Sequence, residues 1–228
     1  MAPLQLGIVL YDFQLLDVAG PVDLLISGSK KMLSTINRDG FVPDDMVDQG
    51  IDINFHYIAP TMDTVTTLMS GFKLQPTTTF EECPKLDAIL LGGPGPDFWN
   101  NIPDSYREFL HRKVDEVQYF FTTCTGAIVA AKAGLLRGKR ATTNSEFLDY
   151  IKEECPDTTW ETARWVIDGK FWTAGGAFAG IDMFEHWLEG RRSDAVVTLS
   201  RSSLAYQPRD INGKEIRELG PRWVIGRN

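Results

Sequence analysis

One stretch near the middle of the chain, residues 117–136, most constrains the fold. It reads VQYFFTTCTGAIVAAKAGLL, an aromatic and β-branched half followed by a half rich in alanine. The first half is typical of a buried strand, and the second is typical of a closely packed helix. Only Cys124, Thr125 and Gly126 separate the two halves, so the chain must turn sharply from strand into helix. A residue at such a turn is strained and lies above the sheet.

Cys124 occupies this turn and is a candidate nucleophile. The partial positive charge at a helix N-terminus favours a thiolate, so we expect a lowered pKa and partial ionisation near neutral pH. Gly126 would allow the close approach that the turn requires. The alternative is a small buried cysteine that closes an ordinary strand. The local sequence leaves both interpretations open.

Segments typical of strands alternate with segments typical of helices along the rest of the chain. We predict strands at residues 4–11, 51–59, 86–91, 140–143, 164–167 and 170–173, a small hairpin at 65–68 and 72–75, and helices at 22–26, 106–117, 145–152, 180–189 and 193–205. This alternation predicts an α/β sandwich of three layers, with a mostly parallel central sheet. We expect one domain over residues 1–228. Residues 28–50 are interpreted as a helix end followed by a surface insertion, and residues 206–228 as an irregular C-terminal tail.

Three candidate pieces of a functional site follow predicted strands. They are Asp17, the pair Gly92 and Gly93, and Cys124. In parallel α/β sheets the site lies at the carboxyl ends of the strands. We therefore expect the three pieces to lie close together. Their predicted proximity is stronger support for a functional site than any one of them alone.

Charge and cysteine content exclude several classes of function. The formal net charge is −8 and no block of lysine and arginine occurs, so neither nucleic acid nor a membrane surface is an expected partner. No apolar run reaches transmembrane length, and the N-terminal residues lack the pattern of a signal peptide. The three cysteines form no CxxC pair, which argues against a disulfide framework and against a structural metal site. A reducing, cytoplasmic location fits best.

Four segments, in this order and spacing, resemble the ThiJ/PfpI superfamily and, within it, the isocyanide hydratases. They are LLDVAGP, ILLGGPGP, FTTCTGAIVAAKAGLLRGKRATT and TAGGAFAGIDM. The resemblance covers most of residues 4–190. It implies a flavodoxin-like fold, a homodimer and no cofactor. It also implies Cys124 as the nucleophile, Asp17 as its acidic partner, and an oxyanion or substrate-binding site at Gly92, Gly93 and Thr125.

The sequence departs from the pattern of the superfamily at several positions. Thr125 follows the cysteine where some relatives have a histidine, and Asn144 replaces a histidine that often follows the ATT strand. Pro94 has no N–H and cannot add a donor beside Gly93. Residues 28–50 form a longer segment than in bacterial hydratases, so the site entrance or the dimer contact could differ.

Each candidate also has an interpretation without catalysis. Asp17 could be an N-cap or first-turn carboxylate, but the resemblance favours a carboxyl that burial and a neighbouring thiolate keep protonated. Such a group would serve as general acid and then as general base. Gly92 and Gly93 could form a plain turn rather than present backbone donors to an anion.

Other reactive residue types are expected to be structural. The three histidines, His56, His111 and His186, fall mid-strand or in helices and are interpreted as structural or surface residues. Cys83 and Cys155 both precede proline at element boundaries. Asp182 is interpreted as a carboxylate favoured by the start of a helix. Three aromatic residues could line a pocket or pack in the core: Trp99, Trp172 and Phe178.

The leading hypothesis for function is hydration of a small neutral isocyanide to an N-substituted formamide. This route needs one nucleophile and one carboxyl that moves protons, and it needs no histidine. A glyoxalase acting on an α-oxoaldehyde ranks lower, because relatives support that chemistry with a histidine where this chain has Asn144. A redox-responsive cysteine protein without enzymatic activity is the third hypothesis. Peptidase activity ranks last, because no base is placed to activate attack on an amide.

Overall fold

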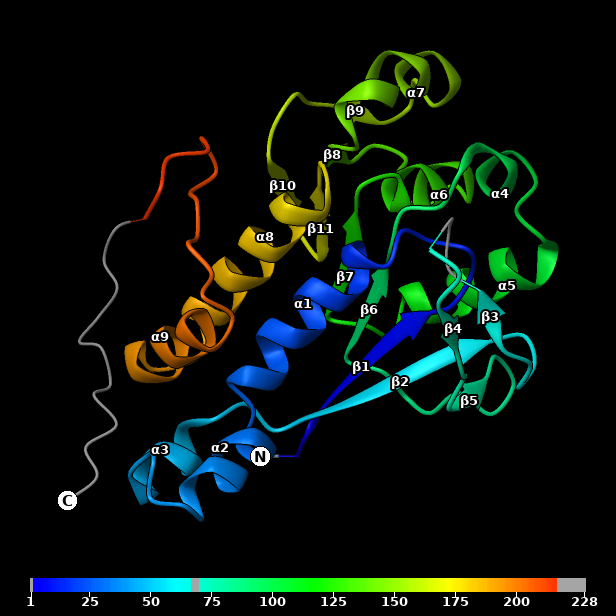
Figure 1. Cartoon of the computed structure of the whole chain (residues 1–228). Coiled ribbons are helices and arrows are strands. Elements are labelled where there is room, and N and C mark those ends of the chain that lie inside the picture. Colours follow the sequence, from blue (N-terminus) through cyan, green and yellow to red (C-terminus); the bar gives the residue numbers. More distant parts are fainter. Residues whose placement is uncertain (1, 67–69, 217–228) are drawn as a thin grey trace.

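A twisted seven-stranded sheet lies at the centre of the structure, a computed structural model that describes residues 2–66 and 70–216 (Figure 1). Six of its strands are parallel, and only the edge strand β10 runs antiparallel to its neighbour. In spatial order the strands are β10 (Trp165–Asp168), β11 (Phe171–Ala174), β7 (Tyr119–Thr123), β6 (Ala88–Leu91), β1 (Leu4–Val9), β2 (Ile53–Ala59) and β5 (Thr78–Thr79). The predicted three-layer α/β fold with a mostly parallel sheet is confirmed.

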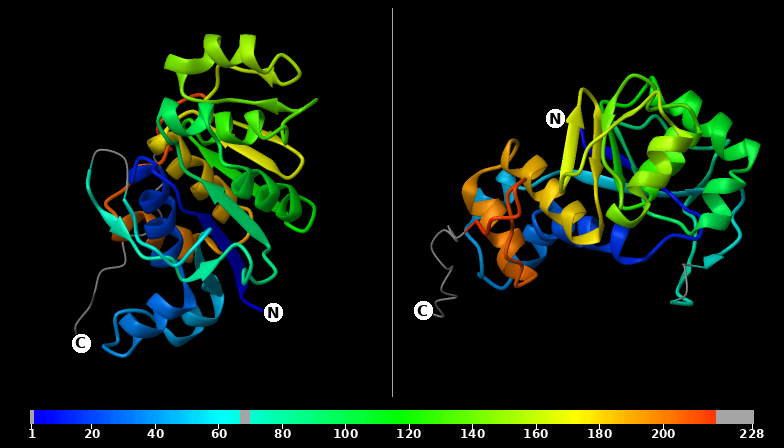
Figure 2. Two further views of the ribbon diagram at one scale, coloured as in Figure 1. Left: turned by 90° about the vertical axis from the view of Figure 1, so that its right-hand side faces the viewer. Right: turned by 90° about the horizontal axis from the view of Figure 1, so that it is seen from above.

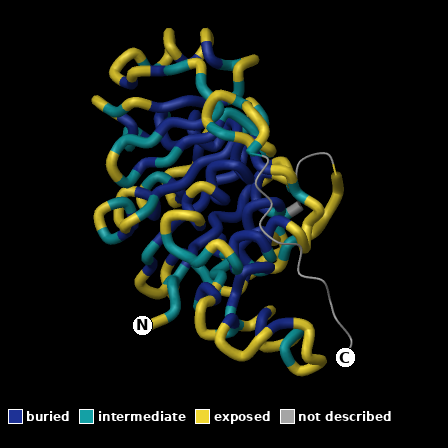
Figure 3. The backbone as a smooth tube through the Cα atoms, turned by 90° about the vertical axis from the view of Figure 1, so that its left-hand side faces the viewer, coloured by how far each residue is buried: buried dark blue, intermediate teal, exposed yellow. Residues whose placement is uncertain are grey.

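Helices cover both faces of this sheet (Figures 1 and 2). One layer consists of α1 (Leu16–Ser27), α8 (Ala177–Glu189) and α9 (Asp194–Ser203). The opposite layer consists of α4 (Pro96–Asn100), α5 (Asp104–Val114) and α6 (Gly126–Lys132). The buried backbone forms a continuous centre between the two layers (Figure 3). Because the central strands β1, β6 and β7 are covered on both faces, most of their residues are buried.

Smaller elements lie around this core. Two short strands, β8 (Arg140–Ala141) and β9 (Thr159–Trp160), form a separate parallel pair, so the predicted strand at 140–143 does not join the main sheet. After β8 the chain forms a 3-10 turn, η1 (Ser145–Phe147), and then α7 (Leu148–Glu154). The predicted hairpin pairs β3 (Val65–Thr66) with β4 (Lys73–Leu74), and its tip at 67–69 lies outside the described residues.

Residues 28–50 contain two short helices, α2 (Lys30–Asn37) and α3 (Asp44–Gln49), in the segment expected to be a helix end followed by a surface insertion. Leu33 and Met46 from these helices pack with Val42 and with Val196 of α9 in a small cluster of their own. This local core explains why the polar segment is ordered. The interpretation of the segment as an insertion stays a prediction.

The start of α1 also differs from the expectation. The helix begins at Leu16, so Asp17 lies in its first turn and Pro21 lies inside the helix. A proline in that place cannot donate a hydrogen bond to the carbonyl of residue 17. The side-chain hydroxyl of Thr123 donates to the Asp17 carbonyl instead, at 3.0 Å. This contact ties the first turn of α1 to the carboxyl end of β7.

Candidate active site

Cys124 lies at a strained turn between β7 and α6, as the sequence predicts. Its φ is +52°, in the left-handed region that non-glycine residues rarely adopt. Its N–H donates to the carbonyl of Ala174 at 2.9 Å, and its carbonyl accepts from the hydroxyl of Thr143 at 3.0 Å. A Cβ on Gly126 would lie 2.4 Å from the Leu91 carbonyl oxygen, so only glycine fits there. The surrounding structure therefore holds the backbone conformation of the nucleophile in place.

Asp17 is fully buried and faces the cysteine. Its Oδ2 accepts the N–H of Gly93 at 2.9 Å, and its carboxyl shares a hydrogen bond with the Cys124 thiol. Its Oδ1 has no hydrogen-bond partner among the described residues. Burial raises the pKa of Asp17 to about 7, and its two hydrogen bonds only partly oppose that rise. The predicted rise is present and burial causes it, as expected, but the contact with Cys124 lowers the pKa instead of adding to the rise.

The glycine pair after β6 supports this carboxyl. A Cβ on Gly93 would lie 2.7 Å from Asp17 Oδ2 and 2.6 Å from the Thr125 hydroxyl oxygen. The Gly92 carbonyl accepts the hydroxyl of Tyr11 at 2.7 Å. Since the Gly93 N–H is already bound to Asp17, the backbone donor that faces the Cys124 sulfur is Thr125 N–H. The hydroxyl of Thr125 donates to the carbonyl of Pro94 at 2.7 Å.

Asn144 is a site residue that the sequence reasoning missed. Its Nδ2 donates to the Cys124 Sγ at 3.4 Å. The sequence showed only that a histidine was absent at this position. Its place directly after the ATT strand was the available signal, because the resemblance already put that strand beside the site.

The expected lowering of the Cys124 pKa is wrong. Burial raises the pKa of this thiol, and negative charge on Asp17 raises it further. Hydrogen bonds from Asn144 and Thr125 lower it, but they do not overcome the loss of water. The helix N-terminus alone therefore does not produce a free thiolate.

The remaining reactive side chains make contacts of their own. His56 pairs with Gln5 at 2.7 Å, His111 with the Ala133 carbonyl at 2.8 Å, and His186 lies 3.8 Å from Glu189. Cys83 and Cys155 are half-buried free thiols. Among the residues that the structure describes, no group of three or more His, Cys, Asp or Glu side chains could hold a metal ion.

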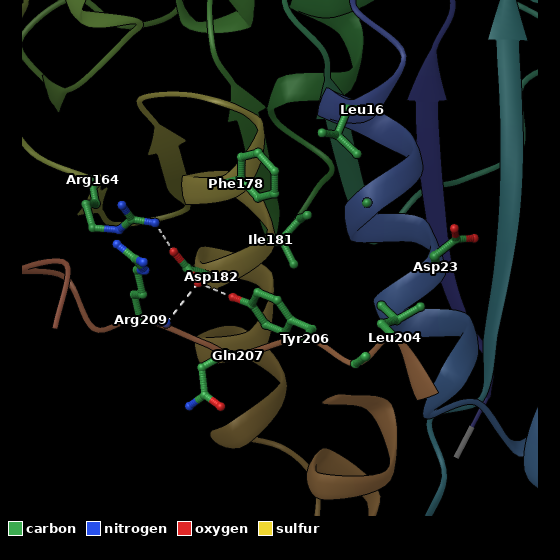
Figure 4. A pocket seen from close by; sticks show the side chains of 12 residues that line it. Leu16, Asp23, Arg164, Phe178, Ile181, Asp182, Leu204, Tyr206, Gln207 and Arg209 are labelled. Carbon is green, nitrogen blue, oxygen red and sulfur yellow. Dashed lines mark hydrogen bonds and ion pairs between the residues drawn. The ribbon is translucent and has the colours of Figure 1, made fainter. Parts of the chain in front are cut away.

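Asp182 lies in the second turn of α8 and is not a residue at the helix start. It forms an ion pair with Arg164 and accepts hydrogen bonds from the Tyr206 hydroxyl and, at 3.0 Å, from the Arg209 N–H (Figure 4). This buried carboxylate attaches the chain after α9 to the core. This role could not be predicted from the sequence, because the partners of Asp182 lie 18 or more positions away.

Two cavities are lined by residues next to the site, namely Leu16 and Thr143, although neither is lined by Asp17 or Cys124. One, of about 770 Å³, lies between α1, α8 and residues 204–209, and Leu16, Ile181 and Phe178 line it (Figure 4). The other, of about 870 Å³, is lined by Thr143, Gly175 and Gly176 beside the cysteine turn, and again by Phe178. The Phe178 side chain is 68% exposed, whereas Trp99 is buried in the core. Of the three aromatics considered as pocket residues, Phe178 thus borders a cavity.

Comparison with known proteins places the chain in a family. Isonitrile hydratase from Pseudomonas putida (isonitrile is a synonym of isocyanide) is 34% identical over 181 residues, which cover 78% of this chain and 68% of that enzyme. An HTH-type transcriptional regulator from Pseudomonas aeruginosa is 24% identical over 158 residues, and the match spans only 42% of the regulator.

Solved structures share the fold. A ThiJ/PfpI family protein from Pseudomonas syringae superposes with a TM-score of 0.73 at 20% identity, covering 91% of this chain and 77% of that one. The sequence model of the DJ-1/PfpI family matches residues 9–190. That range includes Asp17, Gly93, Cys124 and Asn144. The chain belongs to the DJ-1/PfpI family.

Proposed function

We propose that the chain is a cofactor-independent hydratase that converts an isocyanide into an N-substituted formamide through a covalent intermediate on Cys124. The observation that carries the proposal is the contact between this cysteine and a fully buried carboxyl, Asp17, with a pKa raised to about 7. The similarity to isonitrile hydratase supports the substrate class. General acid–base chemistry works best when the pKa of the group lies near the working pH.

In the reactive form, Cys124 and Asp17 together carry one negative charge and share one ionisable proton. Burial raises both pKa values, and charge on Asp17 further opposes ionisation of Cys124. Two groups coupled in this way titrate as a pair. Transfer of the thiol proton to the carboxylate, along their hydrogen bond, produces a thiolate beside a neutral carboxylic acid. Thr125 N–H then stabilises the sulfur charge.

The first half of the reaction forms the covalent intermediate. The Cys124 thiolate attacks the terminal carbon of the isocyanide and forms the C–S bond. The carboxylic acid of Asp17 gives its proton to the same carbon. The products of this half are a thioimidate on the cysteine and a carboxylate on Asp17.

The second half releases the formamide. Asp17 takes a proton from water as the hydroxide adds to the thioimidate carbon, and it passes this proton to the nitrogen. It then takes the hydroxyl proton as the carbonyl forms and the C–S bond breaks. The thiolate and the protonated Asp17 are restored, and the net reaction is the addition of one water to one isocyanide.

The contacts favour this reaction over glyoxalase chemistry. A glyoxalase must move a proton between adjacent carbons, which requires a base on each side of the substrate or one that reaches both. The amide of Asn144 faces the sulfur as a donor and cannot take up a proton. Formation of a 2-hydroxy acid from an α-oxoaldehyde would reverse this ranking.

The test is detection of formamide by mass spectrometry after incubation with a simple alkyl or aryl isocyanide. We expect product with the wild type and none above background with Cys124→Ala. Cys83→Ala is the matched control, because it removes another free thiol and leaves the site intact. Equal formamide from the wild type and Cys124→Ala would contradict the proposal, as would the absence of product with conversion of Cys124 to a sulfinic acid by mild peroxide.

Assembly and location also belong to this proposal. We propose a homodimer that acts on a small neutral organic molecule in the cytoplasm, without nucleic acid or membrane as a partner. Within the described part of the chain, no helix is both long and apolar enough to cross a bilayer. Light scattering of the purified protein tests the homodimer.

A further inference from the structure

We propose that Asn144 is a positioning residue for the nucleophile, whose side-chain amide orients and stabilises the Cys124 thiolate. Its Nδ2 lies 3.4 Å from Sγ, within the range of a hydrogen bond to sulfur. This inference rests on Cys124 being the reactive thiol and is independent of the class of substrate.

The orientation of the amide is determined by its other end. Asn144 Oδ1 accepts the N–H of Glu146 at 3.0 Å and thereby caps the 3-10 turn η1. If the amide were rotated by 180°, its NH₂ group would face the N–H of Glu146, donor against donor. The amide must therefore present its NH₂ group, and not its oxygen, to the sulfur.

The backbone before Asn144 is attached to the same turn that carries the cysteine. The hydroxyl of the buried Thr143 donates to the Cys124 carbonyl at 3.0 Å. The N–H of Thr142 is bound by the hydroxyl of Thr173 in β11, at 2.9 Å. Asn144 is thus connected to Cys124 through both a backbone and a side-chain contact, which limits its movement relative to the sulfur.

Asp17 and Asn144 have different electrostatic roles at the cysteine. Burial and the charge on Asp17 raise the pKa of Cys124, and the Asn144 hydrogen bond lowers it. An amide donor stabilises a thiolate but cannot hold the proton that the thiol loses. That proton therefore goes to Asp17, and the site works with one base. Asn144 replaces the histidine expected here with a donor that does not titrate.

Two variants separate this role from the capping role. Asn144→Ser keeps a side-chain oxygen that can cap η1, but it is too short to reach the sulfur. Asn144→Asp also keeps the cap and replaces the donor with a carboxylate. The measurement is the rate of alkylation of Cys124 by iodoacetamide as a function of pH, followed by mass spectrometry of the Cys124 peptide. Cys83 in the same sample reports general accessibility.

We expect the rate at pH 7.5 to fall about tenfold in Asn144→Ser and further in Asn144→Asp, as the apparent pKa of Cys124 rises. Asn54→Ser, at an exposed asparagine in β2, should leave the rate unchanged. Wild-type pH profiles in both Asn144 variants would overturn the proposal. A change shared by Cys83 would also overturn it, because it would indicate loosening of the fold.

The cavity of about 770 Å³ carries a second inference, which is independent of Asn144 and rests on the proposed function. We infer that this cavity receives the apolar substituent on the isocyanide nitrogen. Leu16, the residue before Asp17 in α1, lines this cavity. Ile181, Leu204 and Phe178, which is 68% exposed, line it as well. A volume of this size is typical of small-molecule sites, and the lining combines these apolar side chains with charged ones such as Asp23 and Arg209.

The test compares methyl isocyanide with cyclohexyl isocyanide in the wild type and in Phe178→Ala. We expect the ratio of kcat/KM for the cyclohexyl to the methyl compound to fall about tenfold in the variant. Phe41→Ala, which removes a partly exposed aromatic residue between α2 and α3, is the control and should leave the ratio unchanged.

An unchanged ratio in Phe178→Ala would overturn the inference and leave the proposed function intact. Dissociation of a dimer without a change in the ratio would assign the cavity to a contact between subunits. If the wild type hydrates neither compound, the proposed function fails, and the substituent site fails with it.

Discussion

Two buried aspartates on neighbouring helices, Asp17 on α1 and Asp182 on α8, show opposite solutions to the burial of a carboxyl. Asp182 has a cation, Arg164, together with a hydroxyl and a backbone N–H. Asp17 has one backbone N–H and a thiol, and its Oδ1 has no partner among the described residues. The negative charge of Asp182 is therefore balanced by a cation and hydrogen bonds, whereas a charge on Asp17 would have no cation beside it in the described part of the chain.

The partners of a buried carboxylate distinguish a structural role from a reactive one. Burial of a charge is unfavourable unless it is paired and hydrogen-bonded. Asp182 meets that condition, so its contacts explain it without any chemistry. Asp17 does not meet it, and its pKa rises to about 7 as a result. An unpaired buried carboxyl beside a cysteine is therefore the stronger sign of function.

The largest expected effect is on turnover by Asp17→Asn. The variant keeps an acceptor for the Gly93 N–H but cannot exchange protons, so we expect kcat to fall by roughly 10³ to 10⁴-fold. Formamide production under saturating isocyanide is the measurement. Asp182→Asn, which we expect to keep kcat within about threefold at 20 °C, is the matched control, and an equal loss in both variants would erase the distinction.

The next effect is on the pH dependence of stability. The raised pKa of Asp17 means that the folded state binds its proton more tightly than the unfolded chain does. The contribution of Asp17 to stability is therefore fully present below the ordinary pKa of aspartate and is lost as the pH rises through about 7. From pH 4 to pH 8 this group lowers the free energy of unfolding by roughly 4 kcal/mol, a fall that Asp17→Asn should lack.

Urea unfolding of the two proteins at several pH values checks this prediction. Cys124 is coupled to Asp17, but its raised pKa keeps it a thiol in the folded state over this pH range. The remaining groups titrate alike in both proteins, so the difference between the two curves isolates residue 17. Parallel curves would mean that Asp17 is ionised in the folded state at low pH, like an exposed aspartate.

A somewhat smaller effect is expected on the stability of Asp182→Asn. The change leaves Arg164 without its counter-charge, and removal of one partner of a buried pair typically costs several kcal/mol. Because Arg164 is about one quarter exposed, we expect a loss of about 3 kcal/mol, at the lower end of that range. Urea unfolding at pH 7 measures it, and a loss below 1 kcal/mol would show that the cluster is not compensated as we describe.

The smallest effect is expected for Tyr206→Phe. This change removes only the hydroxyl that donates to Asp182 and keeps the ring. A hydrogen bond to a charged group contributes about 1.5 kcal/mol, so we expect a loss of that size with unchanged kcat. Thermal unfolding and formamide assays check the two parts, and a fall in kcat would connect the Asp182 cluster to catalysis.

The sequence predicted the parts of the fold that repeat a local pattern. The strand, sharp turn and helix around Cys124 are visible because their composition changes abruptly. The prediction failed at the start of α1, which begins at Leu16 and not at residue 22, because a hydroxyl from β7 replaces the hydrogen bond that Pro21 removes. The two helices within residues 28–50 were not predicted, because α2 and α3 are stabilised by contact with α9, which is distant in sequence.

Three members of the candidate site were predicted, and so was the raised pKa of Asp17, but the direction of the Cys124 pKa shift was not. Asp17, Gly93 and Cys124 were expected together because strand ends meet at one edge of a parallel sheet. The direction of the Cys124 pKa shift was missed, since it depends on how much water the fold removes. Asn144 and the partners of Asp182 were missed because each is defined by contacts between separate elements.

The most direct test of the central claim is to observe the proton on Asp17. Infrared difference spectra of the wild type against Asp17→Asn, taken from pH 5 to pH 9, report the carbonyl stretch of a protonated carboxyl group. We predict a band that is present at pH 6, disappears with a midpoint near pH 7 and is absent in the variant. If no such band is present at pH 6, Asp17 is already ionised, and it cannot be the acid of the proposed reaction.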